Sequence, residues 1–215
     1  MSLAIKVLAV KRVFHFFSLL SLVLLTACSE PEPPWALYNV TGHLPDLEFS
    51  LQGVGNQAVT QASLKNKTVL MFFGYASCPD VCPTTMAQLT EVIVKLGSAA
   101  ADVRIVFVSV DPHRDTPDLL QAYVDAFNKN AIGLTGNEKQ VAALAKRYRV
   151  AYQIEKPKSG DKQDVYDVTH SRGVFIFDRH GKARLLASDT EATDAIASDI
   201  RRLVTGARTG AAATD

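Results

Sequence analysis

Two continuous apolar runs, separated by one amphipathic segment, dominate the hydrophobic pattern of this chain. Val69–Phe73 and Val103–Val110 are rich in β-branched and aromatic residues and end at turn-forming residues, which is typical of buried strands. Between them, Pro83–Leu96 carries apolar residues at helical spacing and has its proline in the first turn. A strand, a helix and a second apolar strand predict a parallel β-α-β unit with a right-handed crossover.

Shorter segments on either side of this unit complete the predicted fold. An alternating run at Leu47–Leu51, a turn at Gly53–Asn56 and a return at Ala58–Thr60 indicate an N-terminal β-hairpin. Thr116 and Pro117 are typical of an N-cap and a first helical residue. Further helices are expected from Pro117 to about Phe127, after Gly136-Asn137 to Tyr148, and over Thr190–Val204. Further strands are expected at Ala151–Ile154, Val165–Val168, Gly173–Phe177 and Ala183–Leu186. This order predicts an α/β, thioredoxin-like fold with an N-terminal β-hairpin extension and one inserted helix.

The first residues of the chain have the pattern of an export signal. Three basic residues precede the apolar run Val13–Ala27, which is too short and too interrupted by polar residues for a comfortable membrane span. The ending Leu-Thr-Ala before Cys28 resembles a bacterial lipoprotein cleavage box, in which the cysteine becomes the lipidated first residue. An uncleaved anchor, or a plain signal with an incidental cysteine, are the alternatives. We therefore expect a membrane-anchored lipoprotein of the bacterial periplasm, divided into a signal peptide (1–27), a tether (28–40), a thioredoxin-like domain (41–205) and a flexible tail (206–215).

Composition and charge exclude some classes of function. The 215 residues are 47% hydrophobic and 21% charged, as in an ordinary globular protein, and the formal net charge is +1. Removal of residues 1–27 leaves 20 basic and 22 acidic residues, so the mature chain has no electrostatic footprint for nucleic acid. If Cys28 carries lipid, Cys78 and Cys82 are the only remaining thiols.

Thiol chemistry is expected at the end of the first buried strand. Cys78 and Cys82 follow that strand and lie at the start of the helix, where the helix N-terminus favours thiolate over thiol. A disulfide across so small a loop would restrict the unfolded chain little, so a purely structural bridge is the weaker interpretation. Asp111 and His113 follow the second strand and are expected at the same edge of the sheet. The residues alone leave open whether the two sulfurs hold each other, a substrate disulfide or a metal.

Three segments resemble the Sco/SenC family of copper-binding, thioredoxin-like proteins that help to assemble cytochrome c oxidase. They are Phe73-Gly74-Tyr75 with Cys78-Pro79-Asp80-Val81-Cys82-Pro83, Val108-Ser109-Val110-Asp111-Pro112 with Arg114-Asp115-Thr116-Pro117, and Val168-Thr169-His170-Ser171 before a strand. The resemblance spans about Gly42 to Val204 and implies copper, as Cu(I) or Cu(II), on Cys78, Cys82 and His170. Thr169 stands where family members often have Asp, but that position is not a ligand. Two thiolates and one imidazole independently form a soft donor set suited to Cu(I).

The resemblance also implies a function and a partner. It predicts a metallochaperone that delivers copper to the copper-centre subunit of cytochrome c oxidase, or to another periplasmic copper protein. Reduction of the acceptor's cysteines through Cys78 and Cys82 is a second activity that this assignment allows. The polar segment Lys156–Gln163 is a candidate docking surface. The alternative is a periplasmic thiol–disulfide oxidoreductase that uses the same two cysteines. A thiol peroxidase on the same fold is a third class, against which the paired cysteines and His170 argue.

Other polar residues near the predicted site receive plainer interpretations. His113 is expected to face solvent, and Asp111 and Asp115 are expected as turn or capping residues, with Asp111 also able to orient a site group. His43 and His180 lie in turns and carry no predicted role.

Overall fold

A computed structural model of the chain describes residues 33–155, 166–188 and 190–211. The described elements belong to the compact unit that begins at Trp35. The expected signal peptide, Cys28 and the Lys156–Gln163 segment lie outside the described residues. Of the helices in the described part of the chain, none is long and apolar enough to cross a membrane.

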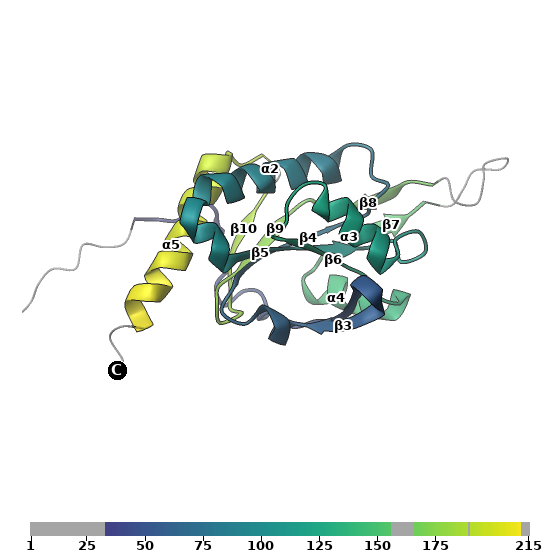
Figure 1. Ribbon diagram of the computed structural model, residues 1–215, viewed down its shortest axis with the longest axis horizontal. Helices are drawn as coiled ribbons and strands as arrows, with labels where there is room; N and C mark the ends of the chain where they lie inside the picture. Colours follow the sequence, from purple (N-terminus) through teal and green to yellow (C-terminus); the bar gives the residue numbers. More distant parts are fainter. Residues whose placement is uncertain (1–32, 156–165, 189, 212–215) are drawn as a thin grey trace, which may run out of the picture. The chain divides into compact units, whose positions relative to one another are not determined.

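A six-stranded mixed sheet forms the centre of the fold, in the order β1-β10-β9-β4-β5-β6 (Figure 1). β4, β5 and β6 run parallel, and β9 joins β4 from the other side as an antiparallel strand. All seven residues of β4 are buried, as the apolar run predicted. The strands are β1 (Tyr38–Asn39), β4 (Thr68–Gly74), β5 (Val103–Ser109), β6 (Ala131–Leu134), β9 (Val174–Phe177) and β10 (Ala183–Ala187).

Helices cover both faces of the sheet. In Figure 1, α2 lies above the sheet and packs against α5, which runs along the left side, whereas α4 lies below the sheet. Thr116 caps α3 by accepting a hydrogen bond from the Leu119 amide, and Pro117 is its first residue, as the sequence predicted. The helices are α2 (Val81–Leu96), α3 (Pro117–Asp125), α4 (Glu138–Arg147) and α5 (Thr193–Ala211), with short 3-10 turns η1 (Val54–Asn56), η2 (Gln61–Leu64) and η3 (Gly97–Asp102).

Two separate two-stranded ribbons complete the structure. β2 (Ser50–Gly53) and β3 (Gln57–Thr60) form the expected N-terminal hairpin. β7 (Tyr152–Ile154) pairs with β8 (Val168–His170) outside the main sheet. The β7–β8 ribbon matters for the site because its last residue is His170.

The structure differs from the sequence expectations in several features. The strand expected at Val165–Val168 lies at Val168–His170. Part of the expected tether, 28–40, is structured, because Leu37 is buried in the core and β1 extends the sheet beside β10. β6 was not expected at all. α5 continues to Ala211, into the segment expected as a flexible tail, although Gly206 and Gly210 each cost a helix about 1 kcal/mol relative to alanine.

Candidate metal centre

The cysteine loop connects the buried strand β4 to helix α2. Cys82 lies in the first turn of α2 and is fully buried, whereas Cys78 lies in the loop before it and is half-buried. The Cys82 amide donates a hydrogen bond to Cys78 Sγ over 3.5 Å. Gly74 allows this arrangement, since a Cβ at that position would lie 2.7 Å from Cys82 Sγ. The close packing of backbone and sulfur thus explains why β4 ends in glycine.

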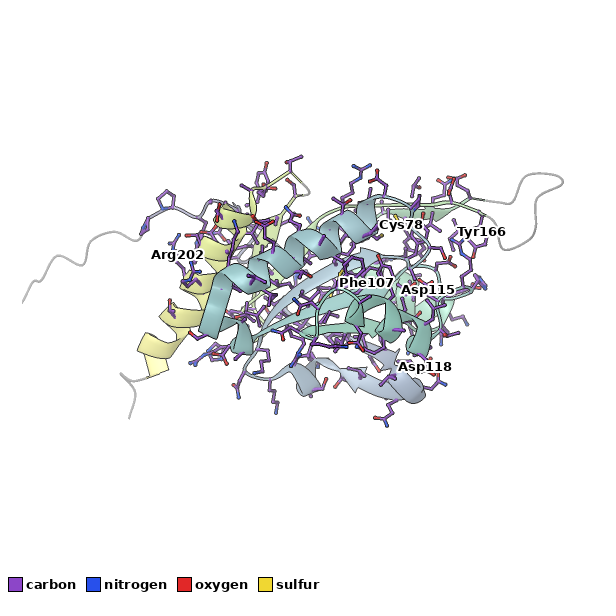
Figure 2. The ribbon with its side chains drawn as sticks, turned by 45° about the horizontal axis from the view of Figure 1, so that its top comes forward. Cys78, Phe107, Asp115, Asp118, Tyr166 and Arg202 are labelled. Carbon is purple, nitrogen blue, oxygen red and sulfur yellow. The ribbon has the colours of Figure 1, made fainter. Side chains whose placement is uncertain are left out.

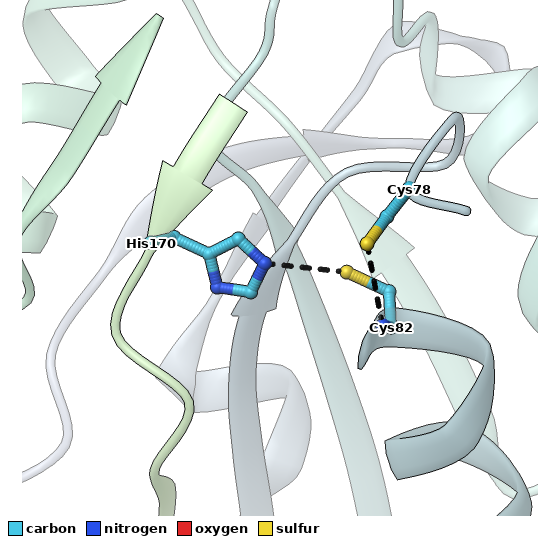
Figure 3. A group of neighbouring side chains, drawn as sticks. All are labelled: Cys78, Cys82 and His170. Carbon is cyan, nitrogen blue, oxygen red and sulfur yellow. Dashed lines mark hydrogen bonds between the residues drawn. The ribbon is translucent and has the colours of Figure 1, made fainter. Parts of the chain in front are cut away.

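His170 reaches the same place from the β7–β8 ribbon. Its Nδ1 lies 2.9 Å from the Ser171 carbonyl oxygen, which can only accept a hydrogen bond. Nδ1 therefore carries the proton, and in the neutral ring the lone pair of Nε2 is free for a ligand. Nε2 lies 3.4 Å from Cys82 Sγ, which donates to it as a thiol (Figure 3).

The structure brings all three predicted ligand residues together. The two sulfur atoms and a ring nitrogen of His170 lie within 4.8 Å of one another, although 88 positions separate Cys82 from His170 in the chain. Figure 3 shows the loop, the helix and the ribbon converging on this point. Both thiols are free, so the group presents two sulfurs and one imidazole nitrogen to an ion. Such a soft, low-coordinate donor set suits Cu(I) among the common metals.

The environments of the ligands separate their pKa values. Burial raises the pKa of the Cys82 thiol well above its ordinary value. Burial would also raise the pKa of Cys78, but hydrogen bonds from the backbone amides of Cys82 and Asp80 outweigh it and lower that pKa. For His170 burial has the opposite effect, because the charged form is the protonated one: burial lowers the pKa, which keeps the ring neutral and able to bind a cation. Cys78 is thus the more acidic of the two thiols and Cys82 the less acidic.

Aromatic rings form the wall behind His170. The rings of Phe72 and Tyr75 meet the imidazole edge to face, with centroids 5.9 Å and 6.0 Å away. Tyr75 is buried, and this burial raises its pKa to about 12, so its hydroxyl stays protonated. The rings restrict the imidazole to an orientation that faces the cysteines.

The other polar residues at this edge of the sheet lie outside the group of three ligand atoms. His113 is 60% exposed and pairs with Glu138 over 3.0 Å, which confirms that it faces solvent. Asp111 and Asp115 are buried and hold the loop after β5 through hydrogen bonds. That loop also contains Arg114, which donates a hydrogen bond to the carbonyl oxygen of Tyr166, 52 positions away, a contact that no local sequence pattern predicts.

Fold and site together define a thioredoxin-like α/β protein with a candidate thiolate–imidazole metal centre. The SCO1/SenC family model matches residues 42–205, and the chain therefore belongs to the SCO1/SenC family. A SCO2-like protein of Rickettsia felis is 35% identical over 136 residues. The match covers 63% of this chain and 65% of that relative, so it spans just under two thirds of the relative's own length.

Solved structures of related proteins confirm the thioredoxin-like fold. Bradyrhizobium japonicum ScoI, solved with copper bound, is 35% identical with a TM-score of 0.65, over 74% of this chain and 98% of that chain. A SCO1/SenC family lipoprotein of Bacillus anthracis is 25% identical with a TM-score of 0.61, over 74% and 94% of the two chains. BsSco, described as a cytochrome c oxidase assembly protein with a disulfide switch, is 26% identical with a TM-score of 0.56, over 82% and 99%.

Proposed function

We propose that this chain binds one copper ion as its cargo through Cys78, Cys82 and His170. The observation that carries the proposal is the convergence of three soft ligand atoms within 4.8 Å, with the tautomer of His170 fixed by the Ser171 carbonyl. Membership of the SCO1/SenC family and the copper-bound relative from Bradyrhizobium japonicum support the choice of copper.

The proposed acceptor is the copper centre of cytochrome c oxidase. The naming of BsSco as a member of the Sco family of cytochrome c oxidase assembly proteins supports this choice. Transfer would proceed by ligand exchange. Cys78 lies in the loop and is less buried than Cys82, so a thiolate of the acceptor would replace Cys78 first while Cys82 and His170 retain the ion.

A copper titration tests the ligand set. The reduced protein, titrated with Cu(I) against a chromophoric chelator, is expected to bind one equivalent. Cys78→Ser, Cys82→Ser and His170→Ala are each expected to weaken binding by more than the roughly 10- to 100-fold typical of residues that only orient a ligand. His113→Ala is the matched control, because that histidine is exposed and paired with Glu138 outside the cluster. Wild-type affinity in His170→Ala would show that the proposed ligand set is wrong.

A thiol–disulfide oxidoreductase is the second candidate function, favoured by the different environments of the two thiols. The Cys78 thiolate would attack an acceptor disulfide, and Cys82 would then resolve the mixed disulfide, which leaves the acceptor reduced and this chain oxidised. The same reaction would let a copper chaperone prepare its acceptor. His170→Ala separates the two functions: a chaperone loses copper and keeps dithiol exchange. Full function of His170→Ala in oxidase assembly would favour the oxidoreductase.

We also propose that Cys28 carries a lipid that anchors the protein in a bacterial membrane, facing the periplasm. The cleavage-box pattern before Cys28 and the Bacillus anthracis lipoprotein support this. Cys28→Ser is expected to abolish labelling by radioactive palmitate and to move the protein from the membrane fraction. Unchanged labelling of Cys28→Ser would show that the lipid is attached to another residue.

A further inference from the structure

The loop between β5 and α3, residues 110–116, contacts both halves of the candidate metal centre, and we call it the bracket loop. On the cysteine side, the Val110 amide donates to the Gly74 carbonyl over 2.8 Å. The Ala76 amide donates to Asp115 Oδ2 over 2.9 Å, and Ser109 Oγ donates to the same oxygen over 2.6 Å. Asp115 is buried, so these contacts hold the start of the cysteine loop at a defined place.

On the histidine side, Arg114 grips the chain just before strand β8. Its Nη1 donates to the carbonyl oxygen of Tyr166 over 2.8 Å, and its guanidinium lies 3.8 Å from the centre of the Tyr166 ring. Its Nε donates to Asp111 Oδ2 over 2.5 Å, and the Tyr166 hydroxyl donates to Asp111 Oδ1 over 2.8 Å. Arg114, Asp111 and Tyr166 therefore form a closed ring of contacts, which includes both the backbone and the side chain of Tyr166.

The ribbon that carries His170 has little support of its own. β7 and β8 pair through three residues each, and neither strand joins the six-stranded sheet. A two-stranded hairpin by itself is marginally stable in water. The position of His170 therefore depends on contacts from outside the ribbon. Arg114 supplies such contacts, and its guanidinium also lies 5.5 Å from the ring of Tyr75, which packs against the imidazole.

The burial of this ion pair is consistent with a positioning role. The Asp111 side chain is fully buried and that of Arg114 is 16% exposed. The attraction within a buried pair is largely cancelled by the cost of removing both charges from water, so such pairs contribute little net stability. Such a pair nevertheless requires a strict geometry. The planar guanidinium of Arg114, with two hydrogen bonds and a stacked ring, allows only one relative position of the loop and Tyr166.

We propose that Arg114 is a positioning residue for the metal centre, which fixes the β7–β8 ribbon so that His170 meets the ion held by the two cysteines. The inference rests on the proposed ligand set of Cys78, Cys82 and His170. It adds a residue that touches no ligand atom but determines where one of the ligands lies.

A double-mutant cycle on copper affinity tests the proposal. Arg114→Lys keeps the charge but loses the planar fork and the stack, and is expected to weaken Cu(I) binding about 10- to 100-fold. In the His170→Ala protein, Arg114→Lys is expected to cause no further loss of Cu(I) affinity, because Arg114 acts through His170. An equal loss in both backgrounds, or no loss in either, would overturn the proposal. If the wild-type protein bound no copper, the proposed function itself would fail instead.

Hydrogen exchange of the metal-free protein provides a readout that does not involve copper. Arg114→Lys is expected to speed exchange of the Ser171 amide, which pairs with the Ala151 carbonyl beside the ribbon, while β4 amides keep their protection. Arg184→Lys is the matched control, since Arg184 pairs with Asp178 over 3.0 Å in the β9–β10 region. Equal exchange in the Arg114 variant and the wild type would contradict a positioning role.

A second substitution approaches the same contact from the other side and protects the test against misfolding of the first variant. Tyr166→Phe keeps the ring over Arg114 and loses only the hydroxyl contact with Asp111, whereas Tyr166→Leu removes the stack. The expected order of copper affinity is wild type, then Tyr166→Phe, then Tyr166→Leu. The reverse order, or equal affinities, would show that the stack does not position His170.

Discussion

At the scale of single residues, the two cysteines are four positions apart but differ in chemistry. Cys82, in the first turn of α2, is fully buried against Gly74 and His170, so its charged form is costly. Cys78 lies nearer to solvent and accepts hydrogen bonds from backbone amides, which stabilise its thiolate. One cysteine is thus suited to reaction with a partner and the other to holding what has been received.

This difference predicts selective alkylation of the metal-free, reduced protein. Because the pKa of Cys78 is lowered, its reaction with iodoacetamide should rise with pH and reach half its maximum at a lower pH than a free cysteine does. Cys82 should remain unmodified over the same range, because its pKa is raised and its side chain is buried. Peptide mass spectrometry after short exposures measures both sites. Faster modification of Cys82 than of Cys78 would contradict this assignment.

At the scale of elements, strand β6 and helix α3 determine where the bracket loop ends. α3 begins immediately after that loop and packs on β6, where Gly133 lies against the backbone of Leu120. A Cβ on Gly133 would lie 2.7 Å from the Leu120 carbonyl carbon and 2.8 Å from its oxygen. The absence of a side chain at Gly133 lets helix and strand approach this closely.

Gly133→Ala should therefore push α3 away from the sheet. We expect a loss of about 1–3 kcal/mol in the free energy of unfolding, the usual cost of overpacking, measured by urea denaturation. Gly206→Ala in α5 is the control, because a Cβ there would meet no described atom within 4 Å and alanine favours a helix by about 0.5–1 kcal/mol. Equal stability of the two variants would show that the contact with Leu120 is not tight.

Long, strongly patterned elements were predictable from sequence, and short ones were not. The buried run of β4 and the apolar face of α2 appear where the pattern placed them. β6 has only four residues, Ala131–Leu134, including a glycine, and its parallel pairing with β5 leaves no alternation to detect. β1 was missed because only two residues pair, although buried Leu37 precedes them.

The same division holds for the site. The proximity of the two cysteines was predictable, because they are only four positions apart and lie at the start of a helix. His170 was placed through the resemblance, since nothing local relates it to Cys82. Arg114 was visible as part of a motif, but its grip on Tyr166, 52 positions away, is a tertiary contact that no periodicity encodes.

At the scale of the whole molecule, a second polar cluster holds the N-terminal segment on α5. Asp199 Oδ2 accepts hydrogen bonds from the amides of Ala36 and Leu37 over 2.8 Å and 2.9 Å. The guanidinium of Arg202 lies 3.9 Å from the centre of the Trp35 ring. Figure 2 shows Arg202 at the opposite end of the domain from Cys78. Residues 35–37 are thus held in place at a distance from the candidate metal centre.

This separation predicts that the N-terminal cluster and copper binding are independent. Asp199→Ala leaves the amides of Ala36 and Leu37 without their acceptor. An unsatisfied buried amide costs about 1–3 kcal/mol of stability, so residues 33–37 should detach from α5 and become sensitive to proteases. The emission of Trp35, the only tryptophan in the sequence, should shift to the red. Asp199→Asn, which retains an acceptor oxygen, should behave more like the wild type. Copper affinity should be unchanged in both variants, because mutations at distant sites with no shared partners act additively. A weaker copper complex in Asp199→Ala would show instead that the two ends of the domain are energetically coupled.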